Sequence, residues 1–497
     1  MRYISTRGTD KNITAKEAIS RGLASDGGLY VPEAIPSLNQ PLEDLLKLPY
    51  PSLAKTILQP FLDFSEDELT GCVNKAYAPS RFTNPKIAPI VTPLKNENSI
   101  HFLELFHGPT LAFKDMALSI LPHLLKVSAP KDELVILTAT SGDTGKAALE
   151  AFCDIENISI AVFYPENGVS PIQKRQMTTQ RGGNTFVFGV HGNFDDAQTG
   201  VKKIFSDLNL AKDMAQMGKG KSGKKFSSAN SINIGRLLPQ IVYYFYAYGQ
   251  LVEKGSLKSG EEINFVVPTG NFGNILAGYY AKQMGLPIRK LICASNDNKV
   301  LYDFFRTGIY DRNREFHCTI SPSMDILVSS NLERLLFHVT NAESVGQMMK
   351  DLATQGRFET HAKMSDFYGI YVTEAETRQA IFEAAQKGYI MDPHTAVAYH
   401  AGQRYIEETG DNTQQVVIST ASPYKFAGDV LEALNCEALN TEISREKDDD
   451  MIAVRILSEK SGTPIPIAVA QLAQLPVRHN IVCSVDDMET IIREKVL

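Results

Sequence analysis

The sequence predicts an α/β protein in which buried parallel strands alternate with helices. Short apolar runs rich in Val and Ile recur from about residue 93 onward, at 133–140, 158–165, 263–269, 290–295 and 415–421. Stretches with helical spacing of apolar residues separate them. Runs of this length that alternate with helices are typical of strands buried on both faces of a parallel sheet.

Composition and charge narrow the class of protein. The 497 residues are 43% hydrophobic and 22% charged, which is enough for a large core divided over about two to four domains. A net charge of -7 and a pI near 5.9 indicate no surface for nucleic acid or anionic membrane. No secretory signal and no long apolar stretch is recognisable, so we expect a cytoplasmic protein without membrane or nucleic-acid partners. The cysteines are widely spaced with no zinc pattern, which predicts reduced thiols and no metal site.

Two regions outside the predicted strands have helical patterns. Residues 1–92 carry amphipathic patches interrupted by prolines and predict a mainly helical cap. Residues 231–252 have apolar side chains at helical spacing and predict a core helix, in which Pro239 either causes a kink or marks a later start.

Two glycine-containing turns follow predicted strands directly and precede helical patterns, at 141–145 and 270–274. Such a turn brings backbone N–H groups and a helix N-terminus together, which favours an anion. Ordinary helix caps would give the same pattern, so neither turn is specific alone. Neither matches a P-loop or a dinucleotide-binding GxGxxG motif, which argues against ATP and NAD.

A third polar segment lies at the start of the predicted core helix. It contains Asn230, Ser231, Asn233 and Arg236, and arginine offers a fixed fork of donors suited to phosphate. An ordinary helix cap followed by a surface arginine would give the same sequence pattern. Near the C-terminus, Asp392 predicts a helix N-cap, and His394 alone does not indicate catalysis.

Lys114 follows Leu-Ala-Phe inside the mostly apolar stretch "LFHGPTLAFKDMAL". A lysine in apolar surroundings holds part of its amine neutral, and a neutral amine is the nucleophile that joins an aldehyde cofactor. The alternative is an ordinary surface pair between Lys114 and Asp115. The lysine becomes a site candidate because the segments above offer cradles for phosphate and carboxylate groups.

Six segments together resemble the motif series of threonine synthases, pyridoxal-phosphate enzymes of fold type II. They read "FHGPTLAFKDMAL", "LTATSGDTGKAALEAF", "NSINIGRLLPQIVYYF", "PTGNFGNILAGYYAK", "DPHTAVAYHAG" and "STASPYKF". The resemblance extends from residue 1 to about 430 and implies two open, twisted, mainly parallel sheets flanked by helices, with a mainly helical N-terminal domain. We expect a cap at 1–92, a large cofactor-binding domain at 93–115 and 225–430, an inserted smaller domain at 116–224 and a C-terminal subdomain at 431–497.

The resemblance also implies roles in holding pyridoxal 5'-phosphate. Lys114 would carry the cofactor and shuttle protons. The turn of Gly270, Asn271, Phe272, Gly273 and Asn274 would hold the cofactor phosphate, Asp143 would lie near the cofactor 3'-hydroxyl, and Thr420 would face the pyridine nitrogen.

The implied reaction converts O-phospho-L-homoserine and water to L-threonine and inorganic phosphate, in a monomer or homodimer. Ser141, Gly142 and Thr144 would hold the substrate carboxylate, and Thr144 is a second catalytic candidate beside Lys114. The substrate phosphate would contact a larger set: Asn230, Ser231, Asn233, Arg236 and Arg175, with Lys174 as a competitor of Arg175.

The chain departs from the family pattern where relatives commonly read "TAHPAKF", because Ser422 and Tyr424 replace histidine and alanine. Three alternatives to a threonine synthase stay open at this point. They are a phosphohomoserine phospho-lyase that forms a 2-oxo acid, a serine/threonine dehydratase, and a non-catalytic relative.

Overall fold

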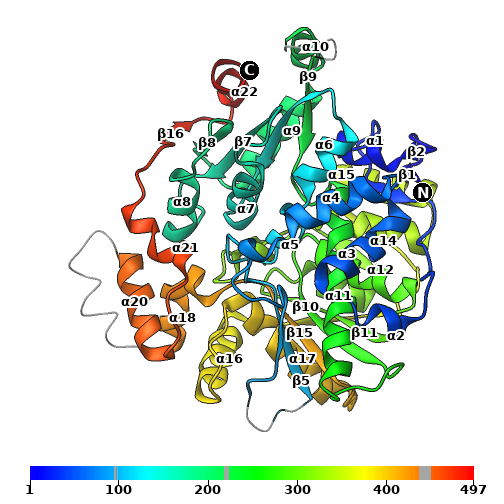
Figure 1. The fold of residues 1–497 in the computed structure, drawn as a ribbon, viewed down its shortest axis with the longest axis vertical. Helices are drawn as coiled ribbons and strands as arrows, with labels where there is room; N and C mark the ends of the chain where they lie inside the picture. Colours follow the sequence, from blue (N-terminus) through cyan, green and yellow to red (C-terminus); the bar gives the residue numbers. More distant parts are fainter. Residues whose placement is uncertain (95–96, 98, 218–222, 436–448) are drawn as a thin grey trace.

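Two mainly parallel sheets form the framework of the molecule (Figure 1). The computed structural model describes the whole chain except residues 95–96, 98, 218–222 and 436–448. The larger sheet has the order β14-β11-β10-β15-β5-β4, and only β4 runs antiparallel to its neighbour. Its strands are β4 (Ile90–Val91), β5 (Ile100–Glu104), β10 (Ile263–Pro268), β11 (Ile288–Ser295), β14 (Phe367–Tyr371) and β15 (Gln415–Ser419).

The second sheet has the order β16-β8-β7-β6-β9, and all of its neighbouring strands are parallel. Its strands are β6 (Glu133–Ala139), β7 (Ile158–Pro165), β8 (Thr185–Val190), β9 (Lys224–Ser228) and β16 (Ile481–Cys483). The two sheets with their flanking helices confirm the predicted fold class. All five strands predicted from apolar runs are present, and β7 has the predicted bounds.

The helices that follow the cap pack through apolar faces on the two sheets or on one another. They are α5 (Asp115–Leu118), α6 (Leu121–Ser128), α7 (Asp143–Phe152), α8 (Pro171–Thr178), α9 (Phe194–Ser206), α10 (Leu208–Gln216), α11 (Ile234–Glu253), α12 (Gly273–Met284), α13 (Val300–Thr307), α14 (Leu332–Val339), α15 (Ala342–Gln355), α16 (Glu374–Gln386), α17 (Pro393–Thr409) and α18 (Ala427–Ala433). Helix α11 is buried along most of its length and contains Pro239 in its interior. Its start at Ile234 shows that the proline does not delay the helix.

The N-terminal region combines helices with a small sheet. Its helices are α1 (Ala15–Arg21), α2 (Leu42–Leu45), α3 (Tyr50–Leu58) and α4 (Glu66–Ala76), and its antiparallel strands are β1 (Arg2–Ser5), β2 (Ile13–Thr14) and β3 (Tyr30–Pro32). Thr14 and Ser65 begin α1 and α4 with capping boxes, in which the cap side chain accepts from a glutamate N–H and that glutamate accepts in return. Sequence patterns predicted the helices but not the sheet.

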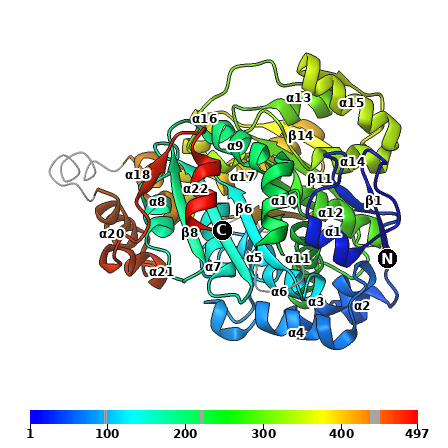
Figure 2. The same ribbon diagram turned by 90° about the horizontal axis from the view of Figure 1, so that it is seen from above.

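The C-terminal residues pass from one sheet to the other. Helix α20 (Asp449–Ser461) packs on α18 beside the larger sheet, and α21 (Ile467–Ala470) follows it. Strand β16 then joins the edge of the smaller sheet, and α22 (Met488–Lys495) lies against α9 (Figure 2). Most of the charged run at 444–450 is outside the described residues, and the domain boundaries remain predictions.

Three buried apolar clusters hold these layers together. One extends from the N-terminal region through α11 and α12 to both sheets, the second lies under α16, α17, α18 and α20, and the third joins the smaller sheet to α9, α10 and α22. Within the described part of the chain, no helix is both long and apolar enough to cross a membrane, and no group of metal-ligating side chains occurs. The five described cysteines are free thiols, and Cys436 is outside the described residues.

Candidate active site

One cavity lies where strands from both sheets end. The chain leaves β6, β9, β10 and β15 at their carboxyl ends and contributes residues to this cavity, as is usual for open parallel sheets. Most predicted site residues line it: Lys114, Ser141, Asp143, Thr144, Asn230, Ser231, Arg236, Gly270, Asn271, Phe272, Gly273, Asn274 and Thr420. The structure therefore brings together segments that are more than 300 residues apart in the chain.

Lys114 is held in place by a pairing between its segment and the one that carries Thr420. The Phe113 N–H donates to the Thr420 carbonyl at 2.8 Å, and the Ser422 N–H donates to the Leu111 carbonyl at 3.0 Å. Leu111 has a φ of 62°, in the left-handed region that a leucine rarely adopts. The chain thus accepts local backbone strain to direct Lys114 into the cavity.

The Lys114 amine is buried beside one carboxylate and two other cations. Its Nζ lies 3.2 Å from Asp143 Oδ2 and 3.2 Å from Ser323 Oγ. Burial lowers the pKa of Lys114, Asp143 opposes this shift, and the charges of Lys425 and Arg236 add to it. A larger share of the amine is therefore neutral than for a solvent-exposed lysine. The neighbouring Asp115 faces away and accepts from the N–H and hydroxyl of Thr110.

Asp143 is the first residue of α7 and is itself fully buried. Burial alone would raise the pKa of this carboxyl, but the charges of Lys425 and Lys114 and a hydrogen bond from Gln173 lower it well below its ordinary value. Gly142 precedes it with a φ of 126°, and an added Cβ would lie 2.4 Å from the Gln173 side chain. Only glycine fits this turn.

The turn at 270–274 shows the features of an anion cradle. Phe272 has a φ of 62° as the N-cap of α12, whose first N–H groups have no acceptor within the helix. A Cβ on Gly270 would lie 2.4 Å from the Ser323 carbonyl oxygen, so the backbone approaches closely there. Asn274 accepts from the Tyr243 and Tyr244 hydroxyls at 2.6 and 2.9 Å. Its buried amide nitrogen has no partner among the described residues.

Arg236 is a second buried donor at this cavity. It is 4% exposed, one terminal nitrogen donates to the Ala229 carbonyl at 3.0 Å, and its Nε has no partner within the described part of the chain. Burial lowers the pKa of the guanidinium to about 10, which leaves it charged at neutral pH. An incompletely paired buried cation beside a cavity favours an anionic ligand.

The remaining predicted residues have other contacts. The Asn233 side chain caps α11 and donates to the carbonyls of Ile19 and Ser228, both at 3.0 Å. The Gly142 N–H donates to the Thr140 hydroxyl at 2.9 Å.

Arg175 lies outside the residues that line the cavity, and its guanidinium donates to carbonyls of the C-terminal segment at Leu472, Ala473 and Leu475. Lys174 pairs with Glu166.

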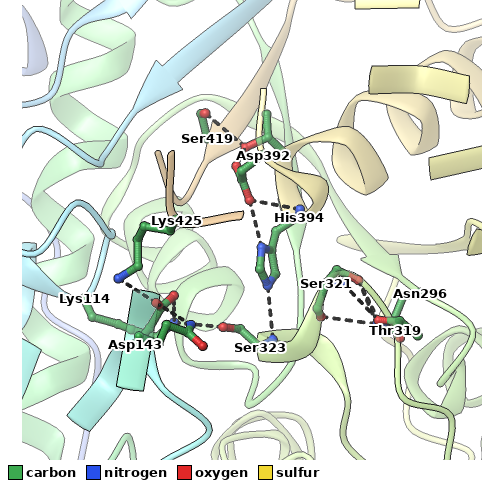
Figure 3. Close-up of polar contacts among 12 residues, drawn as sticks. Lys114, Asp143, Asn296, Thr319, Ser321, Ser323, Asp392, His394, Ser419 and Lys425 are labelled. Atoms are coloured by element: carbon green, nitrogen blue, oxygen red, sulfur yellow. Dashed lines mark hydrogen bonds and ion pairs between the residues drawn. The ribbon is translucent and has the colours of Figure 1, made fainter. Parts of the chain in front are cut away.

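Three polar residues at the site were not selected from the sequence: Lys425, His394 and Ser323 (Figure 3). His394 lines the cavity, its Nδ1 lies 2.8 Å from Asp392 Oδ1, and its Nε2 accepts the Ser323 N–H at 3.1 Å. These contacts specify a neutral ring with the proton on Nδ1. In this group of contacts, only Asp392 had a recognisable sequence signal, as a helix cap.

Family models match almost the whole chain. "Threonine synthase N terminus" matches residues 2–77, "Pyridoxal-phosphate dependent enzyme" matches 88–421, and "Threonine synthase, C-terminal" matches 395–492. This chain belongs to the threonine synthase family. Membership in the threonine synthase family also makes it a pyridoxal-phosphate-dependent enzyme, as the resemblance implied.

Individual members of the threonine synthase family are similar to this chain in sequence and in structure. Threonine synthase of Saccharomyces cerevisiae is 37% identical over 87% of this chain and 89% of its own length. Threonine synthase-like 1 of Macaca fascicularis is 40% identical over 90% of this chain, which spans only 62% of that longer relative. A crystal structure of pyridoxal-phosphate-bound threonine synthase from Brucella melitensis has a TM-score of 0.84 at 35% identity, covering 100% of this chain and 98% of that one.

The cavity fits the cofactor of the threonine synthase family. It joins a buried lysine to a glycine turn at a helix N-terminus, and the Asn274 amide nitrogen, which has no partner in the described part of the chain, is available to an anion there. A larger residue at Gly270 would clash with the Ser323 carbonyl and displace this turn. These are the features that an aldehyde bearing a phosphate requires.

Proposed function

We propose that this chain converts O-phospho-L-homoserine and water to L-threonine and inorganic phosphate. One observation carries the proposal: a single cavity joins the buried amine of Lys114 to three separate groups of anion donors. These are the turn at 270–274, the turn at 141–144, and Arg236 with Asn230 and Ser231. A cofactor phosphate, a substrate carboxylate and a substrate phosphate are three anions, and each would have its own donors.

The cofactor-binding residues follow from this arrangement. Lys114 would hold pyridoxal phosphate covalently, the turn at 270–274 would hold its phosphate through backbone N–H groups, and Thr420 would face its ring nitrogen. Asp143 would lie beside its 3'-hydroxyl. When bound, the cofactor withdraws electrons from the substrate and so stabilises a carbanion next to the amino group.

The substrate-binding residues complete the proposal. The Ser141 and Thr144 groups at the start of α7 would bind the substrate carboxylate, and Gly142 gives the turn its shape. Arg236, with the side chains of Asn230 and Ser231, would bind the substrate phosphate and orient it as the leaving group. Asn233 supports this segment by capping α11.

Proton transfer falls to Lys114 in this scheme. The reaction removes protons from Cα and Cβ of the substrate, expels phosphate from Cγ, returns one proton to Cγ and one to Cα, and adds the hydroxyl of water at Cβ. A lysine acts as a general base only when its amine is unprotonated, and burial lowers the pKa of Lys114. Asp143 Oδ2, at 3.2 Å, would accept a hydrogen bond from the ammonium once it forms.

Product analysis tests the proposal directly. Purified protein supplied with pyridoxal phosphate is incubated with O-phospho-L-homoserine, and threonine, inorganic phosphate, 2-oxobutyrate and ammonia are measured. We expect threonine and phosphate in equal amounts, and we expect the Lys114→Ala variant to lose both the activity and the near-visible absorbance of the bound cofactor.

Other outcomes identify the alternatives. Phosphate release with 2-oxobutyrate and ammonia would replace the proposal by a phospho-lyase, and deamination of serine or threonine would indicate a dehydratase. A protein that shows the cofactor absorbance but turns over none of these substrates would be a non-catalytic relative.

A further inference from the structure

Lys425 is a fully buried lysine that is not one of the predicted site residues but contacts one of them, Asp143 (Figure 3). It lies in the short helix Pro423–Phe426 after β15. Its Nζ is 2.7 Å from Asp143 Oδ1 and donates to the Thr110 carbonyl at 3.0 Å. A buried ammonium is costly unless it is paired and hydrogen-bonded, so this contact is part of a built arrangement.

The two oxygens of Asp143 have different partners. Oδ1 contacts Lys425 and accepts from Gln173 Nε2 at 3.0 Å, whereas Oδ2 is directed toward Lys114. Lys425 and Gln173 therefore fix the carboxylate from one side, independently of what Lys114 does on the other.

The separate partners of the two Asp143 oxygens matter because Lys114 changes charge in the proposed reaction. Whenever its nitrogen is neutral, a buried Asp143 that depended on Lys114 alone would lose its counterion, and a buried carboxylate without one takes up a proton or moves. Lys425 supplies a counterion that takes no part in the chemistry. We propose that Lys425 is a positioning residue that keeps the Asp143 carboxylate charged and directed at Lys114 through the reaction cycle.

Lys425 also influences the Lys114 nitrogen by charge. The charged groups around that nitrogen are Asp143 from α7, Lys425 from the segment after β15 and Arg236 from α11, and neutral His394 lines the same cavity. Asp115, on the helix that begins beside Lys114, lies near Lys425 as well. Loss of the Lys425 charge removes one of the two positive charges that oppose protonation of the Lys114 nitrogen, while Asp143 still favours it, so the protonated form gains.

The proposal rests on the proposed function and is tested on the cofactor-loaded protein with Lys425→Met. Absorbance of the bound cofactor is titrated from pH 6 to 10, and kcat and KM are measured for O-phospho-L-homoserine. We expect the absorbance transition to move up by about one pH unit. We expect kcat to fall on the order of 10- to 100-fold with KM nearly unchanged, because the variant misplaces the carboxylate and leaves the substrate-binding side chains intact.

Lys146→Met is the matched control. Lys146 lies on the same helix as Asp143 and pairs with Glu150 at 2.9 Å, outside the residues that line the cavity. The Lys146→Met protein should have the same absorbance transition, kcat and KM as the unchanged protein. A Lys425→Met protein with the unchanged absorbance transition and kcat overturns the proposal.

If Lys425→Met does not fold, two variants that lack the Asp143 carboxylate test the proposal instead. Asp143→Asn and the double variant Lys425→Met/Asp143→Asn should have kcat values within about threefold of each other, because the carboxylate that Lys425 positions is gone in both. A kcat about tenfold or more lower in the double variant than in Asp143→Asn contradicts the proposal. If the unchanged protein makes no threonine, the proposed function fails, while the absorbance titrations still decide the role of Lys425.

Discussion

Arg236 shows how a single functional residue can be recognised because its burial destabilises the folded protein. Its guanidinium is buried, bonded to one carbonyl, and left without a partner at Nε among the described residues. A cation in this state destabilises the protein unless an anion binds. The proposed substrate phosphate is such an anion.

Arg236→Met should therefore separate function from stability. We expect kcat/KM for O-phospho-L-homoserine to fall on the order of 10- to 100-fold, because a charged hydrogen bond contributes about 1.5–3 kcal/mol. We expect the melting temperature of the variant to equal or exceed that of the unchanged protein. Steady-state kinetics and thermal unfolding measure the two effects. An unchanged kcat/KM, or a clear fall in melting temperature, would mean that Arg236 is structural.

Single residues also mark what a sequence can and cannot reveal. Lys114 and the glycine turns stand out because special backbone or charge requirements leave a local pattern. Lys425 leaves none: a lysine after "SPY" reads as a surface turn, and only the packing of the segment after β15 against α7 places it beside Asp143. Contacts between distant segments of this kind cannot be derived from periodicity.

Helices and strands also differ in how clearly the sequence predicts them. The runs that became β7 and β10 are mostly apolar because both faces of a central parallel strand are covered. Strand β9, at an edge of its sheet, reads "KKFSS", and its polar residues carry no strand signal. The N-terminal β1–β3 sheet was missed because its strands are short.

Helix α8 connects the site to the C-terminal segment. Gln173 on this helix donates to Asp143, and further along the helix Arg175 donates to the carbonyls of Leu472, Ala473 and Leu475. The C-terminal segment is also tied to the turn after β15, because the Tyr424 hydroxyl donates to the Thr463 carbonyl at 2.7 Å. Both elements that hold Asp143 Oδ1 are thus anchored to the same segment.

Arg175→Met tests this anchoring against the role in substrate binding predicted from the sequence. Because three carbonyls lose their donor, we expect the free energy of unfolding to fall by about 1–3 kcal/mol, with KM for O-phospho-L-homoserine changed less than about threefold. Urea unfolding and steady-state kinetics are the measurements, and Lys174→Met on the same helix is the control. A raised KM with unchanged stability would restore Arg175 as a substrate contact.

Across the whole molecule, the N-terminal region shares its core with the rest of the protein. One continuous apolar cluster contains Tyr3, Leu53, Phe245 and Ile418. Arg334 adds a polar connection: it is fully buried and donates to the carbonyls of Tyr30 at 2.9 Å and Ile232 at 2.6 Å. Ile232 follows Ser231 of the site, so this arginine joins the cap to the cavity wall.

A shared core predicts that the cap does not unfold as a separate unit. Far-UV circular dichroism and cofactor absorbance should report one coincident urea transition in the loaded protein. Arg334→Met leaves buried carbonyls without donors and should lower the free energy of unfolding by about 2–4 kcal/mol in both signals together. Lys16→Met, which removes a partly exposed pair with Glu68 at 3.1 Å within the cap, should have a smaller effect. Two separate transitions, with only the first shifted by Arg334→Met, would show instead that residues 1–92 fold independently and that the boundary predicted from the sequence is a thermodynamic one.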